Sequence, residues 1–455
     1  MRLTLRVAAG LIVLSGCATV PDYSITAGPA GIAPAMEGAR GPLSAARSKA
    51  LLDRLGGPPG GFLWRHLAIE QAIADGPLVL GNRTTILRDG PAAFRAIFAA
   101  IAAARLRVDL EYFIIEDVTS DGVTLGDLLA RKRAAGVAVN LIYDSYGSSA
   151  TPTAFFERLR GLGVAMTAFN PVNPLLAGSD YAPNRRDHRK ILIADGKLAI
   201  IGGVNLSVDY QSNPLAAGRA RPEGAGPQWR DTDLQIEGPA VAELAALFAA
   251  HWSQQSKDML TGPPPGAPIA SQGREVVRII GSTPDHDIPR YYVTLLSAIG
   301  NAGLSISITA AYFVPTRQEA EDLADAARRG VKVRLLLPDS SDSQRAIDVA
   351  HSHYADLMEA GVEIYETHGL VLHAKTVVID GVWSIIGSSN FDQRSVLFND
   401  EVDAVVLGPE TAGALELIFA DDLAAATRID PLAWGRRPLG LWLRERFSRG
   451  WESLL

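Results

Sequence analysis

Cysteine and lysine are scarce in this chain of 455 residues, which holds one Cys and, by count, seven Lys. A single Cys excludes an internal disulfide and a Cys-rich metal site. An excess of positive charge is also missing, because the formal net charge is −7. Proteins that bind nucleic acids usually carry a basic face, so we expect no nucleic-acid partner. The apolar content of 47% is ordinary for a protein that buries a core.

Two of the few Lys belong to a motif that occurs twice, with every shared residue offset by 185 positions. The first copy contains His188, Lys190, Asp195, Gly202 and Asn205, and the second contains His373, Lys375, Asp380, Gly387 and Asn390. One chance match to the His, Lys and Asp spacing has a probability on the order of one in a hundred in a chain of this composition. Two matches in register, each with the same Gly and Asn behind it, make coincidence a poor explanation.

The spacing of each copy predicts a β-hairpin. The branched apolar residues over 190–193 and 375–379 favour strands. Asp-Gly after each run is a strong signal for a tight turn, and 198–201 and 383–386 are the expected return strands. His and Lys two positions apart on a strand point to one face. We expect the glycines after each hairpin to let the backbone approach a bound molecule.

Two such hairpins facing each other would bring together two imidazoles, two ammonium groups and two amides. This set suits phosphoryl transfer without a metal, because one His can attack phosphorus while the other protonates the leaving oxygen. We therefore expect no metal and no cofactor. Asp195 and Asp380 have the pattern of structural turn residues, although they belong to the motif.

Strands alternate with helices around both hairpins, which predicts an α/β fold with parallel pairing and helices on both faces. In the first repeat we expect strands over 108–115 and 137–143. We expect one helix that begins at Pro91 and two more over 124–135 and 155–162. In the second repeat we expect strands over 304–310, 331–337 and 362–365 and helices over 288–302, 318–329 and 346–360.

Both motif copies resemble the paired signature of the phospholipase D superfamily, and in particular its bacterial cardiolipin synthases. The resemblance extends to Trp229-Arg230-Asp231-Thr232-Asp233, to Tyr312-Phe313-Val314-Pro315 and to the stretch from Gly387 to Ser395. It covers residues 80 to 455. It implies two βα repeats related by pseudo-two-fold symmetry, with mixed, largely parallel sheets and the active site at the repeat interface.

The resemblance also implies an activity: a phosphatidyl group passes from one phosphatidylglycerol to another through a phosphatidyl-histidine, giving cardiolipin and glycerol. Lys190, Lys375, Asn205 and Asn390 would stabilise charge on the phosphate oxygens. A phospholipase D-type hydrolase would use the same site with water, and a non-catalytic, envelope-tethered binding protein is a further alternative. Two intact His/Lys pairs speak against the latter.

An acidic residue follows each motif copy. Aligning Gly238-Pro239 with Gly408-Pro409 pairs Asp231 with Glu401. In the superfamily such an acid holds the far nitrogen of a catalytic His. It would fix the tautomer of the ring and stabilise the imidazolium.

The assignment of the nucleophile rests on charge and on the resemblance. Arg185, Arg186 and Arg189 surround His188, and they should lower its pKa and keep it neutral. The same arginines could attract an anionic head group, or simply form a solvated basic loop. His373 lies in a less cationic stretch. We expect His188 to be the nucleophile, as in the superfamily, and His373 the general acid/base.

The N-terminus predicts export and lipidation. Arg2 and Arg6 precede a short apolar run over 7–14, which is too short to span a membrane, and the run ends in Leu14-Ser15-Gly16-Cys17. This end resembles a bacterial lipobox, in which Cys17 would carry the lipid. We therefore expect an envelope lipoprotein at the outer membrane or at the periplasmic face of the inner membrane. An ordinary secretory signal is the alternative.

The C-terminal stretch interleaves five Arg with three Trp, leucines and a Phe, which is typical of a segment that lies in a membrane interface. A terminal helix packed on the domain is an equal alternative. The expected division of the chain is a leader over 1–17, a tether with short helices over 18–77, a first domain over 78–260, a linker over 261–272, a second domain over 273–430 and the basic tail over 431–455.

Overall fold

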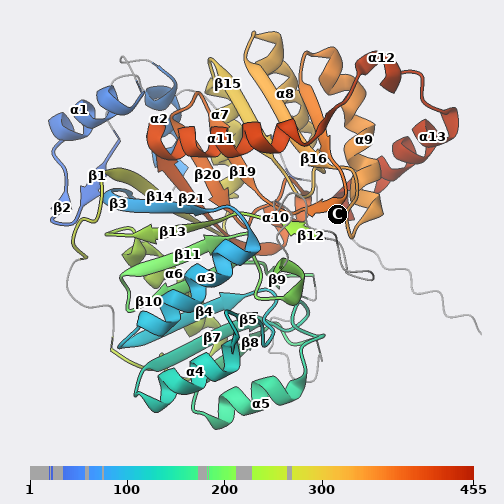
Figure 1. The fold of residues 1–455 in the computed structure, drawn as a ribbon. Helices are drawn as coiled ribbons and strands as arrows, with labels where there is room; N and C mark the ends of the chain where they lie inside the picture. The colour runs from blue at the N-terminus through green and yellow to red at the C-terminus, as the bar shows by residue number, and fades with distance from the viewer. Residues whose placement is uncertain are drawn as a thin grey trace, which may run out of the picture.

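The computed structural model describes residues 20, 22–23, 34–56, 61–73, 76–172, 182, 184–211, 228–263 and 269–454. The expected leader with Cys17 lies outside these residues, as do residues 18–19, 21, 24–33, 57–60 and 74–75 of the segment expected over 18–77. Within them the chain forms two halves with the same order of elements, a first half over 78–255 and a second half over 275–424. The halves lie one against the other in Figure 1, the first in blue to green and the second in yellow to red.

Each half contains a seven-stranded sheet with the same order and the same directions. In the first half the order is β8 (Ala165–Phe169), β7 (Ala138–Asp144), β4 (Arg107–Tyr112), β10 (Lys190–Ala194), β11 (Leu198–Gly202), β13 (Asp233–Glu237) and β3 (Leu78–Leu87). In the second half it is β17 (Glu363–Thr367), β16 (Lys332–Pro338), β15 (Ser305–Thr309), β19 (Thr376–Ile379), β20 (Trp383–Gly387), β21 (Asn399–Leu407) and β14 (Glu275–Ser282). The first three strands of each order run parallel and the remaining pairs are antiparallel. The predicted mixed α/β fold is therefore confirmed.

Helices cover the outer face of each sheet. These are α3 (Gly90–Ala103), α4 (Leu125–Ala134) and α5 (Thr153–Gly161) in the first half, and α7 (Arg290–Asn301), α8 (Arg317–Arg328) and α9 (Gln344–Glu359) in the second. Each lies close to the range expected from the sequence. Two further helices precede the first half: α2 (Phe62–Ile73) packs against α7, and α1 (Ala45–Gly56) packs against α2.

The two halves share one apolar core. Ile191 and Ile193 of β10 face this shared core together with Val402 and Val406 of β21, while Leu192 packs against the helices of its own half. Helices α6 (Val241–Gln255) and α11 (Pro409–Ala424) complete the shared core. Side chains on a strand alternate between its two faces. One face of each hairpin therefore packs on the helices of its own half, and the other face packs in the core shared with the opposite half. Strands β3 and β14 also pair directly across the boundary between the halves.

Both predicted hairpin turns are confirmed. Asp195 and Asp380 have φ values of 52°, and the glycines after them have φ values of 63° and 64°. Positive φ at both central residues is the conformation that Asp-Gly favours in two-residue hairpin loops.

The glycines after the hairpins lie against acidic side chains. A Cβ at Gly203 would collide with the carboxylate of Asp231, and a Cβ at Gly387 would collide with Asp403. These positions therefore make room for the acidic side chains of Asp231, just before β13, and of Asp403 in β21.

Candidate active site

Each motif His follows a short strand that pairs with the other half. Strand β9 (Arg186–Asp187) runs parallel to the start of β21, and the backbone N–H of His188 donates to the carbonyl of Asp400 at 2.9 Å. Strand β18 (Leu370–Leu372) runs parallel to β12 (Gln228–Arg230), and the N–H of His373 donates to the carbonyl of Arg230 at 2.7 Å. The two short ladders therefore place each His beside the acidic residue of the opposite half.

The side chain of each His also contacts the acidic side chain of the opposite half. Nδ1 of His188 lies 3.0 and 3.1 Å from the carboxylate oxygens of Glu401, and Nδ1 of His373 lies 2.6 Å from Oδ2 of Asp231. Both carboxylates are fully buried. With Nδ1 turned to a carboxylate, Nε2 of each imidazole is left for chemistry, which is the arrangement of a His–acid pair in acid-base catalysis.

Hydroxyl groups hold Glu401 in place. Ser388 Oγ donates to one carboxylate oxygen at 2.5 Å and Ser395 Oγ to the other at 2.9 Å. Burial alone would raise the pKa of Glu401, but His188, Lys190 and Ser388 lower it below its ordinary value. The group therefore remains a carboxylate that can accept from the imidazole.

The two lysines turn back toward the His that precedes each of them. Lys190 Nζ donates to the carbonyl of His188 at 2.6 Å, and Lys375 Nζ donates to the carbonyl of His373 at 2.5 Å. Burial, reinforced by the like charge of Lys375 and opposed by Glu401, lowers the pKa of Lys190 to about 7. Burial also lowers the pKa of Lys375. Neither ammonium group forms an ion pair with a carboxylate among the described residues, so the two charges make the site attractive to an anion.

The electrostatic contrast expected between the two His is wrong. Arg185 is paired with Asp400 and Asp285, and the buried Arg189 with Glu111. The pKa of His188 is lowered by burial and then by the two lysines rather than by these arginines. The pKa of His373 is also lowered, to about 4, through burial and Lys375, whose Nζ lies 2.9 and 3.2 Å from the ring nitrogens.

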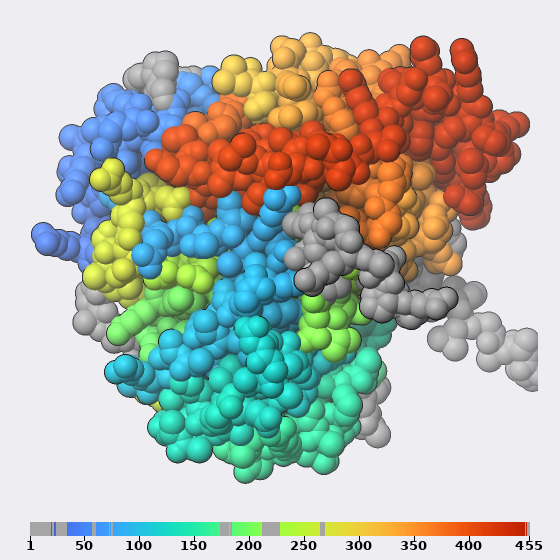
Figure 2. Space-filling view, in the orientation of Figure 1, coloured from blue at the N-terminus to red at the C-terminus, as the bar shows by residue number. Residues whose placement is uncertain are grey.

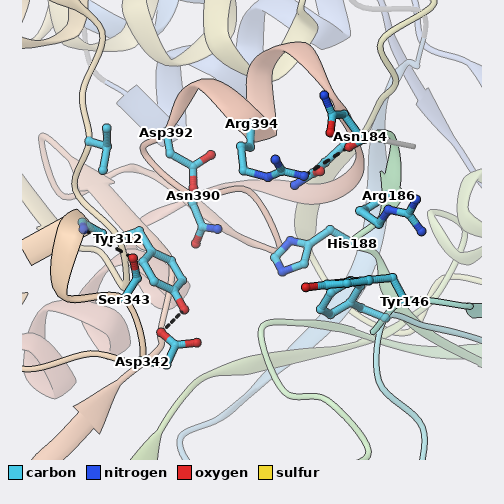
Figure 3. A pocket seen from close by; sticks show the side chains of 14 residues that line it. Tyr146, Asn184, Arg186, His188, Tyr312, Asp342, Ser343, Asn390, Asp392 and Arg394 are labelled. Carbon is cyan, nitrogen blue, oxygen red and sulfur yellow. Dashed lines mark hydrogen bonds between the residues drawn. The ribbon is translucent and has the colours of Figure 1, made fainter. Parts of the chain in front are cut away.

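The two motif asparagines differ in their surroundings. Asn205 accepts from the N–H of Ile114 at 3.1 Å and donates to the hydroxyl of Tyr210 at 3.1 Å. The side-chain oxygen of Asn390 is buried and has no hydrogen-bond partner among the described residues. In Figure 3 the amide of Asn390 faces the same open space as the ring of His188. Asn390 is thus the asparagine that is free to bind a ligand.

Asp195 and Asp380 are turn residues, as their pattern indicates. Asp195 accepts from three successive backbone N–H groups, those of Arg105, Leu106 and Arg107, at 2.7 to 2.9 Å. Asp380 accepts in the same way from residues 303–305 at 2.7 to 3.0 Å. These carboxylates fasten the far end of each hairpin to the strand beside it. The structure gives them no contact with His188 or His373.

A cavity of about 620 Å³ opens in front of His188, between the two halves. Its polar lining comes from both halves and is drawn in Figure 3: Tyr146, Asn184, Arg186, Tyr312, Asp342, Ser343, Asn390, Asp392 and Arg394. Of the three arginines around His188, only Arg186 lines this cavity. The ring of Tyr312 also lies 6.1 Å from that of His373, so the second His borders the same wall.

Three aromatic neighbours of the His pair were not singled out as site residues in the sequence. The hydroxyl of Tyr210 lies 3.2 Å from Nδ1 of His373, the ring of Trp229 lies 5.2 Å from the His373 ring, and Phe113 is 5.2 Å from the ring of His188. The position of Trp229 two residues before Asp231 was an available signal. Tyr210 and Phe113 carry no motif that marks them.

One group of possible metal ligands occurs in the described part of the chain, the buried side chains of Glu111, Asp187 and His251. The guanidinium of Arg189 already lies 3.3 Å from Glu111, and Nδ1 of His251 lies 2.8 Å from the same carboxylate. A positive charge is therefore built into this group by the chain itself.

No helix within the described ranges is both long enough and apolar enough to cross a membrane.

Comparison with known proteins gives close relatives in sequence. A family model described as "Cardiolipin synthase, PLD-like domain" matches residues 295–423. The cardiolipin synthase of Geobacillus thermodenitrificans is 33% identical over 393 residues, which span 86% of this chain and 75% of the relative. Cardiolipin synthase A of Pseudomonas aeruginosa is 34% identical over 360 residues, spanning 78% of this chain and 70% of the relative.

Among solved structures, a phosphatidylserine synthase from Haemophilus influenzae superposes with a TM-score of 0.60. The match covers 85% of this chain and 99% of the other, at 11% sequence identity. At this identity the likeness shows the shared fold alone.

Proposed function

The chain belongs to the cardiolipin synthase family within the phospholipase D superfamily, and from this premise we propose that it is a phosphatidyltransferase acting on two molecules of phosphatidylglycerol. The products are cardiolipin and glycerol. The observation that carries the proposal is the pair of imidazoles, each oriented by a buried carboxylate of the opposite half, in a chain that matches cardiolipin synthases over most of its length.

In the first step Nε2 of His188 attacks the phosphorus of one phosphatidylglycerol. The bond from phosphorus to the glycerol oxygen breaks, and His373 donates a proton to that oxygen. A phosphatidyl group is then bound to His188, and Glu401 stabilises the positive charge on the ring. His188 is the better candidate for attack because it lines the cavity directly.

In the second step His373 removes the proton from a terminal hydroxyl of the second phosphatidylglycerol. The hydroxyl oxygen attacks phosphorus, and the bond to His188 breaks. His373 needs a proton in the first step, although burial and Lys375 lower its pKa to about 4. A phosphate anion bound beside Lys375 would offset the ammonium charge that contributes to this lowering, and would raise the pKa of His373 again.

The phosphate oxygens would be held by Lys190, Lys375 and the amide of Asn390. Asn205, which already donates to Tyr210, would act mainly by positioning that tyrosine beside His373.

A hydrolase would share every residue of this mechanism and differ only in the molecule that reaches the intermediate. Purified protein with vesicles of labelled phosphatidylglycerol separates the two. We expect cardiolipin and one glycerol for each cardiolipin, measured by chromatography. Phosphatidic acid as the sole lipid product would show that water is the acceptor and would overturn the synthase assignment.

The buried lysine predicts a pH limit on this activity. Since the pKa of Lys190 is lowered to about 7, the ammonium loses its charge as the pH rises through that value. We expect kcat/KM to fall about fivefold between pH 7 and pH 8, as a single titration near 7 requires. In Lys190→Arg the guanidinium stays charged, so the alkaline fall should move to higher pH even if the rate is lower. The same fall in both proteins would contradict the role of Lys190.

Membrane attachment belongs to the same proposal, because the substrate lies in a bilayer. We propose that lipidation of Cys17 anchors the chain to the cell envelope. The pattern before this residue, positive charge followed by a short apolar run, supports that assignment.

A further inference from the structure

The C-terminal segment forms a lobe on the outside of α9. It consists of α12 (Pro431–Trp434), α13 (Leu439–Ser448) and the 3-10 helix η3 (Arg449–Leu454), and it projects at the upper right in Figures 1 and 2. The sequence left open whether this segment lies in a membrane interface or packs on the domain. In the structure it packs on the domain and yet exposes much of its apolar surface.

Helix α13 turns its polar face inward. Glu445 is 2% exposed and accepts from both terminal nitrogens of Arg437, at 2.7 and 2.9 Å. Arg444 pairs with Asp348 of α9 at 2.8 Å, and Arg449 donates to the carbonyl of Ser352 at 2.9 Å. Ion pairs and hydrogen bonds from Arg444 of α13 and from Arg449 therefore tie the lobe to α9.

The apolar face of α13 points outward. Leu439, Leu443 and Phe447 follow one another at intervals of four residues, which places them on one side of the helix, and they are 69%, 54% and 74% exposed. Trp442 and Leu432 of the same lobe are also exposed. A helix on the surface of a globular protein normally has the opposite orientation, with its apolar stripe against the core.

The charges of the lobe indicate what covers this face. Residues 431–454 contain five Arg and two acidic residues, a net charge of +3 in a chain of net charge −7. Both acids are engaged, Glu445 by Arg437 and Glu452 by His353. The side chains of Arg436 and Arg446 are exposed and have no acidic partner among the described residues. A cavity of about 430 Å³ between the lobe and α9 is lined in part by Trp442 and Arg446.

We propose that this face docks on a bilayer that contains anionic phospholipid, with the apolar side chains inserted at the interface and the arginines at the head groups. Leucine, Trp and Phe beside Arg on one short helix are the composition of interfacial helices. The inference rests on the proposed function in one respect, since that function explains why the active site should lie at a membrane.

The lobe is continuous with the rim of the active-site cavity. Asp348, which holds Arg444, lies in the first turns of α9, and Ser343 and Ala346 at the start of this helix line the cavity. The 3-10 helix η3 packs against α10 (Gln393–Leu397), whose Arg394 also lines the cavity. A bilayer that covers the lobe would therefore come close to the entrance through which a lipid substrate reaches His188.

Fluorescence of Trp442 tests the contact directly. The full chain is mixed with phosphatidylglycerol vesicles whose acyl chains carry bromine, which quenches Trp only at close range. We expect part of the emission to be quenched, and that part to be lost in Trp442→Phe but retained in Trp64→Phe, which removes a buried Trp of α2. An equal quenched share in wild type and Trp442→Phe would overturn the proposal.

A second pair of variants tests the energetic role of the face. Leu443→Asp/Phe447→Asp should weaken binding to phosphatidylglycerol vesicles by at least about tenfold. Each substitution removes the favourable free energy of moving an apolar side chain from water into the bilayer. The control Leu304→Asp/Leu417→Asp changes two exposed leucines elsewhere and should bind as wild type. These variants are made with Cys17→Ser in the full chain, so that a lipid anchor does not mask the difference. Unchanged binding, or lipid-free self-association that Leu443→Asp/Phe447→Asp abolishes, would overturn the inference and indicate a different occupant.

Activity measurements separate this inference from the proposed function. On monomeric short-chain phosphatidylglycerol, Leu443→Asp/Phe447→Asp should turn over as fast as the control, whereas on vesicles it should be at least about tenfold slower. Failure of the synthase assignment would appear as no cardiolipin from the wild type on either substrate, with the quenching of Trp442 unaffected.

Discussion

His188→Ala and His373→Ala should each lower turnover by at least about a hundredfold, since acid-base and nucleophilic catalysis by these imidazoles supplies that much or more. Each half-reaction uses both rings, so neither variant should retain a partial activity. The measurement is cardiolipin formed from labelled phosphatidylglycerol vesicles, with circular dichroism as the control for folding. A folded variant that keeps more than about a tenth of the wild-type rate would show that the two-His mechanism is wrong.

The same variants assign the nucleophile. With a substrate whose leaving group needs no proton, His373→Ala should still form the first bond and accumulate a phosphatidyl adduct, because the second step then lacks its base. Mass spectrometry should find an acid-labile adduct on His188. An adduct on His373 in His188→Ala, with none on His188 in His373→Ala, would reverse the roles.

The second large effect is expected at the carboxylates. Glu401→Gln and Asp231→Asn should each lower kcat about a thousandfold or more, because an amide does not stabilise the imidazolium and can hold the ring in the wrong tautomer. The contact crosses the halves, so Glu401→Gln should affect the reactivity of His188 and Asp231→Asn that of His373. Adduct formation on His188 with the activated substrate should therefore slow in Glu401→Gln more than in Asp231→Asn. Slower adduct formation in Asp231→Asn than in Glu401→Gln would contradict the pairing of Glu401 with His188 and of Asp231 with His373.

Asp195→Asn and Asp380→Asn are the matched controls, because they make the same chemical change within the motif. Each of these carboxylates accepts three backbone N–H groups, so the substitution should lower the free energy of unfolding by about 1–3 kcal/mol. Turnover at a temperature where the variants are folded should stay near that of the wild type. A large loss of turnover in folded Asp195→Asn would mean that the motif Asp acts in catalysis.

Local patterns predicted most of the secondary structure near the site. The Asp-Gly turns, the parallel strands and the outer helices agree with the sequence to within a few residues, because each depends on periodicity and turn chemistry within a short window. The alignment of Asp231 with Glu401 likewise needed only the repeat. The lobe over 431–454 has the composition expected of it, but composition could not say which face of α13 turns inward.

The sequence by itself determined the membership of the family, the two His/Lys pairs and the acids that follow them, because these are identities and spacings along one chain. Only the tertiary structure decided which acid holds which imidazole. That choice depends on the pairing of β9 with β21 and of β12 with β18, which join residues more than a hundred positions apart. Arg185 and Arg189 do not line the cavity in the folded protein. Asp285 and Asp400 bind the guanidinium of Arg185, and Glu111 binds that of Arg189. Interactions of this kind are set by contacts between distant strands, and no local pattern encodes them.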